Sequence, residues 1–81
     1  MERLKSSKKK IIRLKQTIKA IKNDSVDIVY IANDAEEPIK NSIFEECRGK
    51  DIQIVQVDTM KKLGEACGID VNASCASLLK A

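Results

Sequence analysis

The chain has 81 residues, of which 43% are hydrophobic and 33% are charged, with three glycines and one proline. This length supports one domain with one modest hydrophobic core, and the composition excludes a low-complexity chain. No apolar run approaches the roughly 20 residues that cross a bilayer, and no apolar segment follows the basic N-terminus. We therefore expect a cytoplasmic protein with no membrane span and no signal peptide.

The net charge of +3 is unevenly distributed along the chain. Residues 1–22 contain nine Lys or Arg and one Glu, a balance of +8, whereas residues 23–81 contain six basic and eleven acidic residues, a balance of −5. Such an asymmetry produces a positive field that attracts phosphate groups, so a polyanion is the natural partner. The alternative is that the basic N-terminal segment, residues 1–10, is only a solvated arm.

Strand and helix patterns alternate from residue 11 onward. A brief strand is predicted at residues 11–12, and the helix after it ends at the turn formed by residues 23–25. An apolar stripe on this helix lies beside a cationic stripe: Leu14, Ile18 and Ile21 form the first, and Lys15, Lys19 and Lys22 the second. Val26–Ala32 is almost continuously apolar and β-branched, which predicts a central strand covered on both faces.

A second helix and a second strand are predicted in residues 34–57. Asp34 is the expected N-cap, Pro38 lies in the first turn, and Gly49 takes a left-handed conformation at the end. The expected buried stripe of this helix consists of Ile39, Ile43, Phe44 and Cys47. The strand over residues 52–57 follows.

The remaining residues predict a short helix, a loop and a last strand. Asp58 and Thr59 are the expected caps of the helix, and Gly68 ends it. Its expected core side chains are Met60, Leu63, Ala66 and Cys67. The alternation of strands and helices predicts an α/β fold: a three-layer α/β/α sandwich with a central mixed sheet of about four strands.

The three cysteines and the lack of histidine argue against catalysis and cofactors. An odd number of cysteines in a chain without a secretory signal makes a disulfide framework unexpected, and no spacing suits zinc. A nucleophilic cysteine would have no histidine as its base. We expect buried thiols, no enzyme activity, no metal, no cofactor and no small-molecule substrate; a redox role for Cys67 or Cys75 is a distant alternative.

Three polar residues at the start of the first helix are candidates for nucleic-acid recognition. Lys15, Gln16 and Lys19 lie within its first turn or so, where free backbone N–H groups and the positive end of the helix dipole attract phosphate. Lysine donates to guanine O6 and N7, and glutamine offers a donor and an acceptor together. The alternative is that these residues are only the solvated face of an amphipathic helix.

Three segments carry a resemblance to a known family. Residues 14–19 (LKQTIK) resemble the helix-opening motif of the ribosomal protein L7Ae family of kink-turn RNA-binding proteins. Residues 60–71 (MKKLGEACGIDV) resemble its most diagnostic segment, and residues 28–39 (IVYIANDAEEPI) are similar to its core strand and the helix start that follows. The small size is similar to the short bacterial, ribosome-associated members. The resemblance extends from about residue 11 to residue 79 and implies that the single domain expected over residues 1–81 binds RNA.

The resemblance also implies roles for individual residues. Lys15, Gln16 and Lys19 would contact the sheared G·A pairs of a kink-turn, and a loop would cover its bulge. The loop residues are Ile69, Asp70 and Val71, and Val71 would lie near the flipped-out nucleotide together with Glu36 and Met60. Alternatively, Ile69 and Val71 only pack at the entry of the last strand, and Glu36 only stabilises a helix dipole.

Arg13 and Leu14 complete the candidate RNA-binding set, and Arg13 departs from the family pattern. Arginine stands where the family has a glycine that lets RNA approach the backbone closely. Its long cationic side chain either adds a phosphate or guanine contact or obstructs docking.

The aromatic content restricts how RNA could be recognised. Tyr30 and Phe44 are the only aromatic residues, and both lie in apolar runs that predict burial, so stacking of bases on exposed rings is not expected. The resulting hypothesis is a kink-turn RNA-binding protein whose RNA partner includes rRNA and which associates with the ribosome. The alternative is a ribosome-docking or protein-interaction domain that adheres to rRNA through nonspecific electrostatic attraction.

Overall fold

Helices and strands alternate along residues 9–80, which are the residues that the computed structural model describes. In chain order they are β1 (Lys10–Ile11), α2 (Leu14–Lys22), β2 (Val26–Ala32), α3 (Glu37–Cys47), β3 (Gln53–Val57), α4 (Met60–Cys67) and β4 (Cys75–Leu79). Every predicted element is present. Most of the predicted basic segment, residues 1–8, lies outside the described residues.

The four strands form one mixed sheet in the order β1-β4-β2-β3. β2 pairs with β3 in parallel and with β4 in antiparallel fashion, so that Tyr30 lies opposite Val55 on one side and Ala76 on the other. β1 begins one residue earlier than predicted because Lys10 pairs with Leu78, and its ammonium group donates to the Cys67 carbonyl at 2.6 Å.

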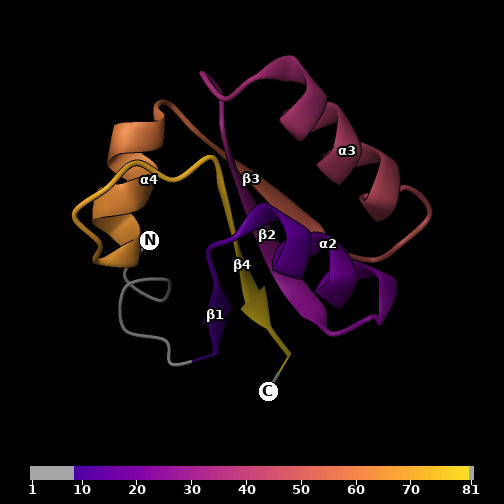
Figure 1. The fold of residues 1–81 in the computed structure, drawn as a ribbon. Coiled ribbons are helices and arrows are strands. Elements are labelled where there is room, and N and C mark those ends of the chain that lie inside the picture. The colour runs from indigo at the N-terminus through magenta and orange to yellow at the C-terminus, as the bar shows by residue number, and fades with distance from the viewer. Residues whose placement is uncertain (1–8, 81) are drawn as a thin grey trace.

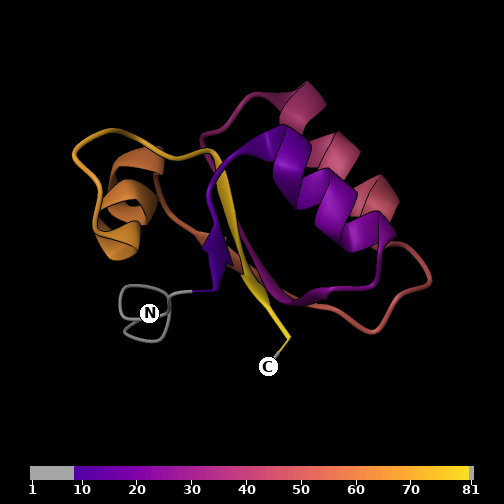
Figure 2. The same ribbon diagram turned by 60° about the horizontal axis from the view of Figure 1, so that its bottom comes forward.

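Helices cover both faces of this sheet. α2 and α3 lie on one face and α4 on the other (Figures 1 and 2). Alternate residues of β2 therefore enter two cores: Tyr30 packs with Leu63 beneath α4, and Val29 packs with Ile21 and Ile43 beneath α2 and α3. The predicted three-layer sandwich with a four-stranded mixed sheet is confirmed, including the coverage of β2 on both faces.

Two predictions about α3 are wrong. Asp34 does not cap α3: the helix begins at Glu37 with Glu36 in the extended N-cap position, and neither an Asp34 bond nor a Glu36 side-chain bond closes its start. Phe44 is 39% exposed, because the stripe through Ile43 and Cys47 faces the sheet and the next residue lies about 100° further round the helix.

The buried stripe of α2 is shifted from its predicted position. Leu14 and Ile18 are only half-buried, whereas Thr17, Ala20 and Ile21 are buried. Thr17 is tolerated in the interior because its hydroxyl lies 3.5 Å from that of Ser77, itself fully buried. This rotation leaves the cationic stripe exposed.

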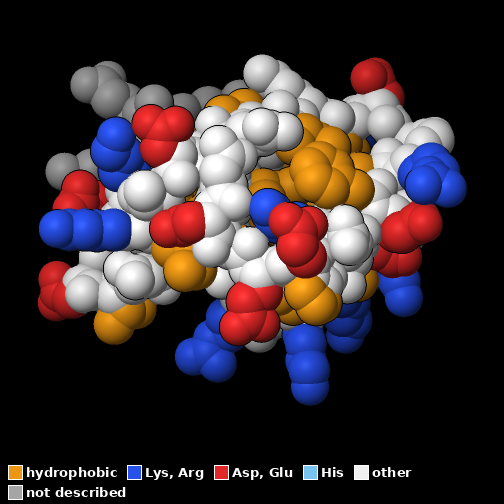
Figure 3. Space-filling view, turned by 90° about the horizontal axis from the view of Figure 1, so that it is seen from above, with side chains coloured by type: hydrophobic (Ala, Val, Ile, Leu, Met, Phe, Trp, Pro, Cys, Tyr) orange, Lys and Arg blue, Asp and Glu red, His pale blue; other side chains and the backbone are white. Residues whose placement is uncertain are grey.

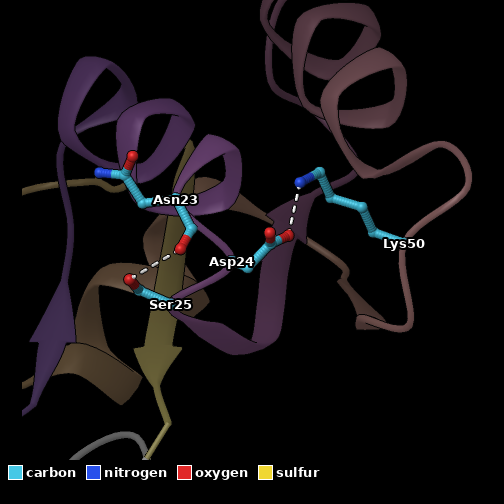
Figure 4. A network of polar contacts seen from close by, with 4 residues as sticks. All are labelled: Asn23, Asp24, Ser25 and Lys50. Atoms are coloured by element: carbon cyan, nitrogen blue, oxygen red, sulfur yellow. Dashed lines mark hydrogen bonds and ion pairs between the residues drawn. The ribbon is translucent and has the colours of Figure 1, made fainter.

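The other predicted helix ends are confirmed, except that Asp58 does not cap α4, because its carboxylate pairs with the Lys62 ammonium group at 3.4 Å. The Thr59 hydroxyl accepts a hydrogen bond from the Lys62 N–H at 3.0 Å, and Gly68 ends α4 with a φ of 79°. Gly49, just beyond α3, has a φ of 76°. Asp24 is left-handed at 57°, and its carboxylate accepts a hydrogen bond of 2.6 Å from Lys50 (Figure 4).

All three cysteines are buried and unpaired, as predicted. Burial raises the pKa of each thiol, and that of Cys75 rises to about 11. The thiols therefore stay protonated near neutral pH, which disfavours the redox alternative. Within residues 9–80 no cluster of His, Cys, Asp or Glu could bind a metal ion. The helices of this range also lack the combined length and apolar character of a membrane span.

Candidate nucleic-acid interface

One edge of the sheet gathers the starts of all three described helices. β1, β2 and β3 run in the same direction, so α2, α3 and α4 begin beyond the same edge, and residues 68–74 return there to enter β4. This edge is at the top of Figure 1 and faces the viewer in Figure 3, where exposed hydrophobic side chains lie among acidic ones and a row of Lys or Arg side chains follows the lower border. Helix starts attract anions, so this edge is the first candidate for a nucleic-acid site.

A groove of about 440 Å³ lies at this edge between the start of α2 and the loop of residues 68–74. Arg13 and Leu14 line it together with Ile69 and Val71, so the chain brings together two predicted segments that are more than 50 residues apart. Its other lining residues are Ile12, Ile39, Asn72, Ala73, Ser74 and Cys75. Val71 is 67% exposed, so it places an apolar side chain at the surface beside this groove.

The start of α2 carries uncompensated positive charge. Its N-cap, Arg13, makes no side-chain hydrogen bond to the helix, and no acidic residue lies in the first turn. The first helical bond joins the Thr17 N–H to the Arg13 carbonyl at 2.9 Å, so the N–H groups of the three preceding residues have no partner in the helix. An incoming phosphate or base acceptor would meet these donors and the helix dipole together.

The three polar residues of α2 are exposed and available. Lys15, Gln16 and Lys19 all lie on the surface, and their side chains make no ion pair or hydrogen bond within residues 9–80. Lys22 differs, since its ammonium group lies 3.7 Å from the Glu46 carboxylate. Gln16 and Lys19 line a separate hollow of about 270 Å³. Lys15 lines neither this hollow nor the groove.

The loop of residues 68–74 lies directly on α4 because Gly64 has no side chain. A Cβ at Gly64 would collide with the carbonyl oxygen of Val71 and would lie 3.3 Å from the Asn72 Cα. The Gly64 carbonyl also accepts a hydrogen bond from the Ile69 N–H at 3.1 Å. Sequence reasoning used Gly64 only as a marker of the family, whereas this glycine determines where the loop lies.

The remaining predicted residues surround the groove without lining it. Met60 is half-buried against the loop, where its Sδ accepts a hydrogen bond of 3.5 Å from the Ser74 hydroxyl. Glu36 is exposed at the start of α3. Asp70 is exposed and lines a third hollow of about 320 Å³ with Lys61 and Glu65. Glu36, Met60 and Asp70 are thus absent from the lining of the groove.

The backbone at Arg13 explains why arginine is tolerated there. Its φ is −91°, an extended conformation that any residue adopts. The fold therefore does not require a glycine at this position. The arginine side chain would affect only the binding of a ligand in the groove.

Comparisons with known proteins identify the family. The model of the ribosomal protein L7Ae/L30e/S12e/Gadd45 family matches residues 2–81. The chain is 52% identical over 69 residues to the RNA-binding protein TTE2299 of Caldanaerobacter subterraneus subsp. tengcongensis, which is 85% of this chain and 84% of that protein. It is 35% identical over 79 residues to the RNA-binding protein YbxF of Geobacillus stearothermophilus, which is 98% of this chain and 96% of that protein.

Solved structures agree with the fold. The Giardia lamblia 15.5kD RNA binding protein superposes with a TM-score of 0.82 at 24% identity, covering 99% of this chain and 68% of that one. A protein of unknown function from Bacillus halodurans gives 0.84 at 22% identity, covering 96% and 78%. The names of the relatives agree with the expectation of a binding protein and not an enzyme. The chain belongs to the ribosomal protein L7Ae/L30e/S12e/Gadd45 family.

Proposed function

We propose that this protein is a non-enzymatic RNA-binding module that recognises kink-turns and stabilises their folded form. The observation that carries the proposal is the groove in which the uncapped start of α2 faces the loop of residues 68–74. The two relatives named above are called RNA-binding proteins, which supports RNA as the ligand.

The start of α2 is suited to guanine edges in a distorted duplex. Lys15 and Lys19 donate to O6 and N7, and Gln16 supplies a donor and an acceptor. Regular A-form RNA hides its major groove, so these side chains would reach base edges only where the duplex is sharply bent or bulged. Sheared G·A pairs in a kink-turn present such edges.

The loop supplies the other half of the contact. Ile69 and Val71 place apolar surface at the groove, which suits an unstacked nucleotide of the bulge. Glu36, Met60 and Asp70 flank this position. We propose that Arg13 adds a contact to a backbone phosphate, because its side chain is exposed and lines the groove.

A direct binding comparison tests this function. Affinity is measured for a kink-turn duplex and for the same duplex with its G·A pairs replaced, in the same buffer and salt. We expect a clear preference for the intact kink-turn, accompanied by bending of the RNA. Equal affinity for the two duplexes would contradict specific recognition.

The charge asymmetry favours one alternative, a domain that docks on the ribosome and adheres to rRNA without reading a motif. Such adhesion depends on the lysine-rich residues 1–10 and falls steeply with salt, because it comes from counterion release. A variant that lacks residues 1–8 separates the two functions: motif recognition retains its preference for the kink-turn, whereas nonspecific adhesion is lost. Either function fits a cytoplasmic protein that works on or near the ribosome.

A further inference from the structure

Asp34 connects two segments that sequence reasoning did not relate. It is exposed in the turn between β2 and α3, where its position suggested a cap for α3. Instead, its Oδ1 accepts a hydrogen bond of 2.7 Å from the backbone N–H of Met60, the first residue of α4. The carboxylate therefore caps a helix that begins 26 residues later.

Met60 in turn fixes the far end of the loop that lines the groove. Its carbonyl accepts a hydrogen bond of 3.0 Å from the Ala73 N–H, and its sulfur accepts the 3.5 Å bond from the Ser74 hydroxyl. The Ser74 carbonyl accepts a hydrogen bond of 3.0 Å from the Ala32 N–H at the end of β2. Asp34 and Ala32 thus reach the loop from the same turn, through Met60 and Ser74 respectively.

No other described group replaces Asp34 in this arrangement. The Met60 N–H is at the first helical position and has no partner within α4. The Thr59 hydroxyl is occupied by the Lys62 N–H at 3.0 Å, two positions further along the helix. Without the Asp34 carboxylate, the first residue of α4 would have only water as its acceptor.

We propose that Asp34 is a positioning residue for RNA recognition. By fixing Met60, it fixes the Met60–Ala73 hydrogen bond and thereby the loop that presents Ile69 and Val71 at the groove. A loop that is already ordered before binding loses less conformational entropy when RNA arrives, so the preference for the kink-turn depends on this carboxylate. The proposal rests on the proposed function, since it concerns the same groove.

Electrostatics and positioning predict opposite effects of removing Asp34. A carboxylate near the interface repels phosphate, so loss of its charge alone would tighten the binding of any RNA. Loss of the hydrogen bond would instead weaken the binding of the kink-turn relative to other RNA. The ratio of the two affinities separates the explanations, because a general charge effect acts on both RNAs and cancels.

The experiment compares Asp34→Ala, Asp34→Asn and Asp58→Ala with the unaltered protein. Asparagine retains an Oδ1 acceptor without the charge. Asp58 is a matched control, because its exposed carboxylate lies two residues before Met60 and, within residues 9–80, pairs only with Lys62 at 3.4 Å. The readouts are the affinities for the intact and the G·A-replaced duplex, and hydrogen exchange of the Met60 and Ala73 amides in the free protein.

We expect Asp34→Ala to lower the affinity ratio by about three- to tenfold, the range of one lost hydrogen bond. Asp34→Asn should stay within about twofold of the unaltered protein, and Asp58→Ala should leave the ratio unchanged. The Met60 and Ala73 amides should exchange faster in Asp34→Ala alone.

Two results would overturn the proposal: an Asp34→Ala ratio equal to that of Asp58→Ala, or an Asp34→Asn ratio as low as that of Asp34→Ala. If the unaltered protein shows no preference for the kink-turn, the proposed function fails and the RNA role of Asp34 fails with it. Hydrogen exchange in the free protein then still measures whether Asp34 fixes the loop, so the two failures remain distinguishable.

Discussion

The starts of α2 and α4 lie at the same edge of the sheet and are finished in opposite ways. At α4, Asp34 accepts from the N–H of Met60 and Thr59 accepts from that of Lys62, so two of the free donors are satisfied by side chains. At α2, no side chain caps the helix and no acid lies in the first turn. One helix start is closed by the protein itself, and the other is left open.

This difference assigns different roles to the two helix starts. A missing N-cap costs about 1 kcal/mol of stability, so the open start of α2 is a local weakness of the free protein. The same free donors, together with Lys15 and Arg13, are what a phosphate or a base acceptor would bind. The closed start of α4 carries the loop that completes the groove. We infer that the capped start of α4 stabilises the fold, whereas the uncapped start of α2 is available to bind a ligand.

The largest effect is expected when the closed start of α4 and its loop are disturbed at Gly64. Gly64→Ala should destabilise the protein by about 1–3 kcal/mol, because the added methyl group collides with the Val71 carbonyl and must displace the loop. It should also abolish most of the preference for a kink-turn. Urea unfolding and the two-duplex comparison measure these effects.

The neighbouring exposed residue provides the control for this change. Glu65→Ala also introduces alanine into α4, but at an exposed position where it shortens the side chain, so the free energy of unfolding should change by less than about 0.5 kcal/mol. If Gly64→Ala were as stable and selective as Glu65→Ala, the loop would not depend on the missing side chain.

On the open side, Gln16→Ala and Lys19→Ala test the contact directly. Each should cost about 1–3 kcal/mol of kink-turn binding if its side chain reads a base edge. Lys22→Ala is the matched control, since this lysine belongs to the same cationic stripe but lies 3.7 Å from Glu46. Its loss should weaken both duplexes alike. If Lys19→Ala and Lys22→Ala changed the two affinities equally, the cationic stripe would act only through general charge attraction.

A smaller effect is expected from closing α2 artificially. Arg13→Ser provides an N-cap hydroxyl at a residue that is already extended, so it should stabilise the protein by about 0.5–1 kcal/mol relative to Arg13→Ala. Both variants should bind RNA more weakly, and the slope of log affinity against log salt concentration should fall by about 1, as expected for the loss of one phosphate contact. Tighter binding by Arg13→Ala would instead mean that the arginine obstructs docking.

The sequence predicts the fold well because local signals agree with the tertiary structure at most positions. The β-branched run Val26–Ala32 and the glycines after α3 and α4 determine their elements regardless of context. Phe44 and Asp34 were misplaced because their environments depend on neighbours distant in sequence. Helical spacing alone does not reveal which neighbouring residue faces the sheet, and cap propensity does not reveal which helix start is within reach.

The candidate site was predictable in part for the same reason. Exposure of Lys15, Gln16 and Lys19 follows from the amphipathic pattern of α2. The position of Arg13 and Leu14 opposite Ile69 and Val71 does not follow from that pattern, because it depends on a loop whose path is set by contact with Gly64. Short-range pattern identifies such residues, and only packing brings them together.

The two ends of α2 also differ from each other. Its start is open, but the turn after its end is fixed by the 2.6 Å contact of Asp24 with Lys50 (Figure 4). The hydrogen bond and the charge of Lys50 lower the pKa of Asp24 below its ordinary value of 3.8. Because the folded-state pKa is the lower one, this contact contributes stability above pH 3.8 and loses it as the pH falls through the folded-state pKa.

The ionisation of Asp24 should therefore not change the free energy of unfolding between pH 5 and pH 8, where the carboxylate stays charged. An NMR titration should show the pKa of Asp24 rising toward 3.8 in Lys50→Ala but not in Lys50→Arg, which retains the charge. The shift should shrink at high salt, because both side chains are reached by solvent. An unchanged Asp24 titration in Lys50→Ala would show that Lys50 does not stabilise the Asp24 carboxylate.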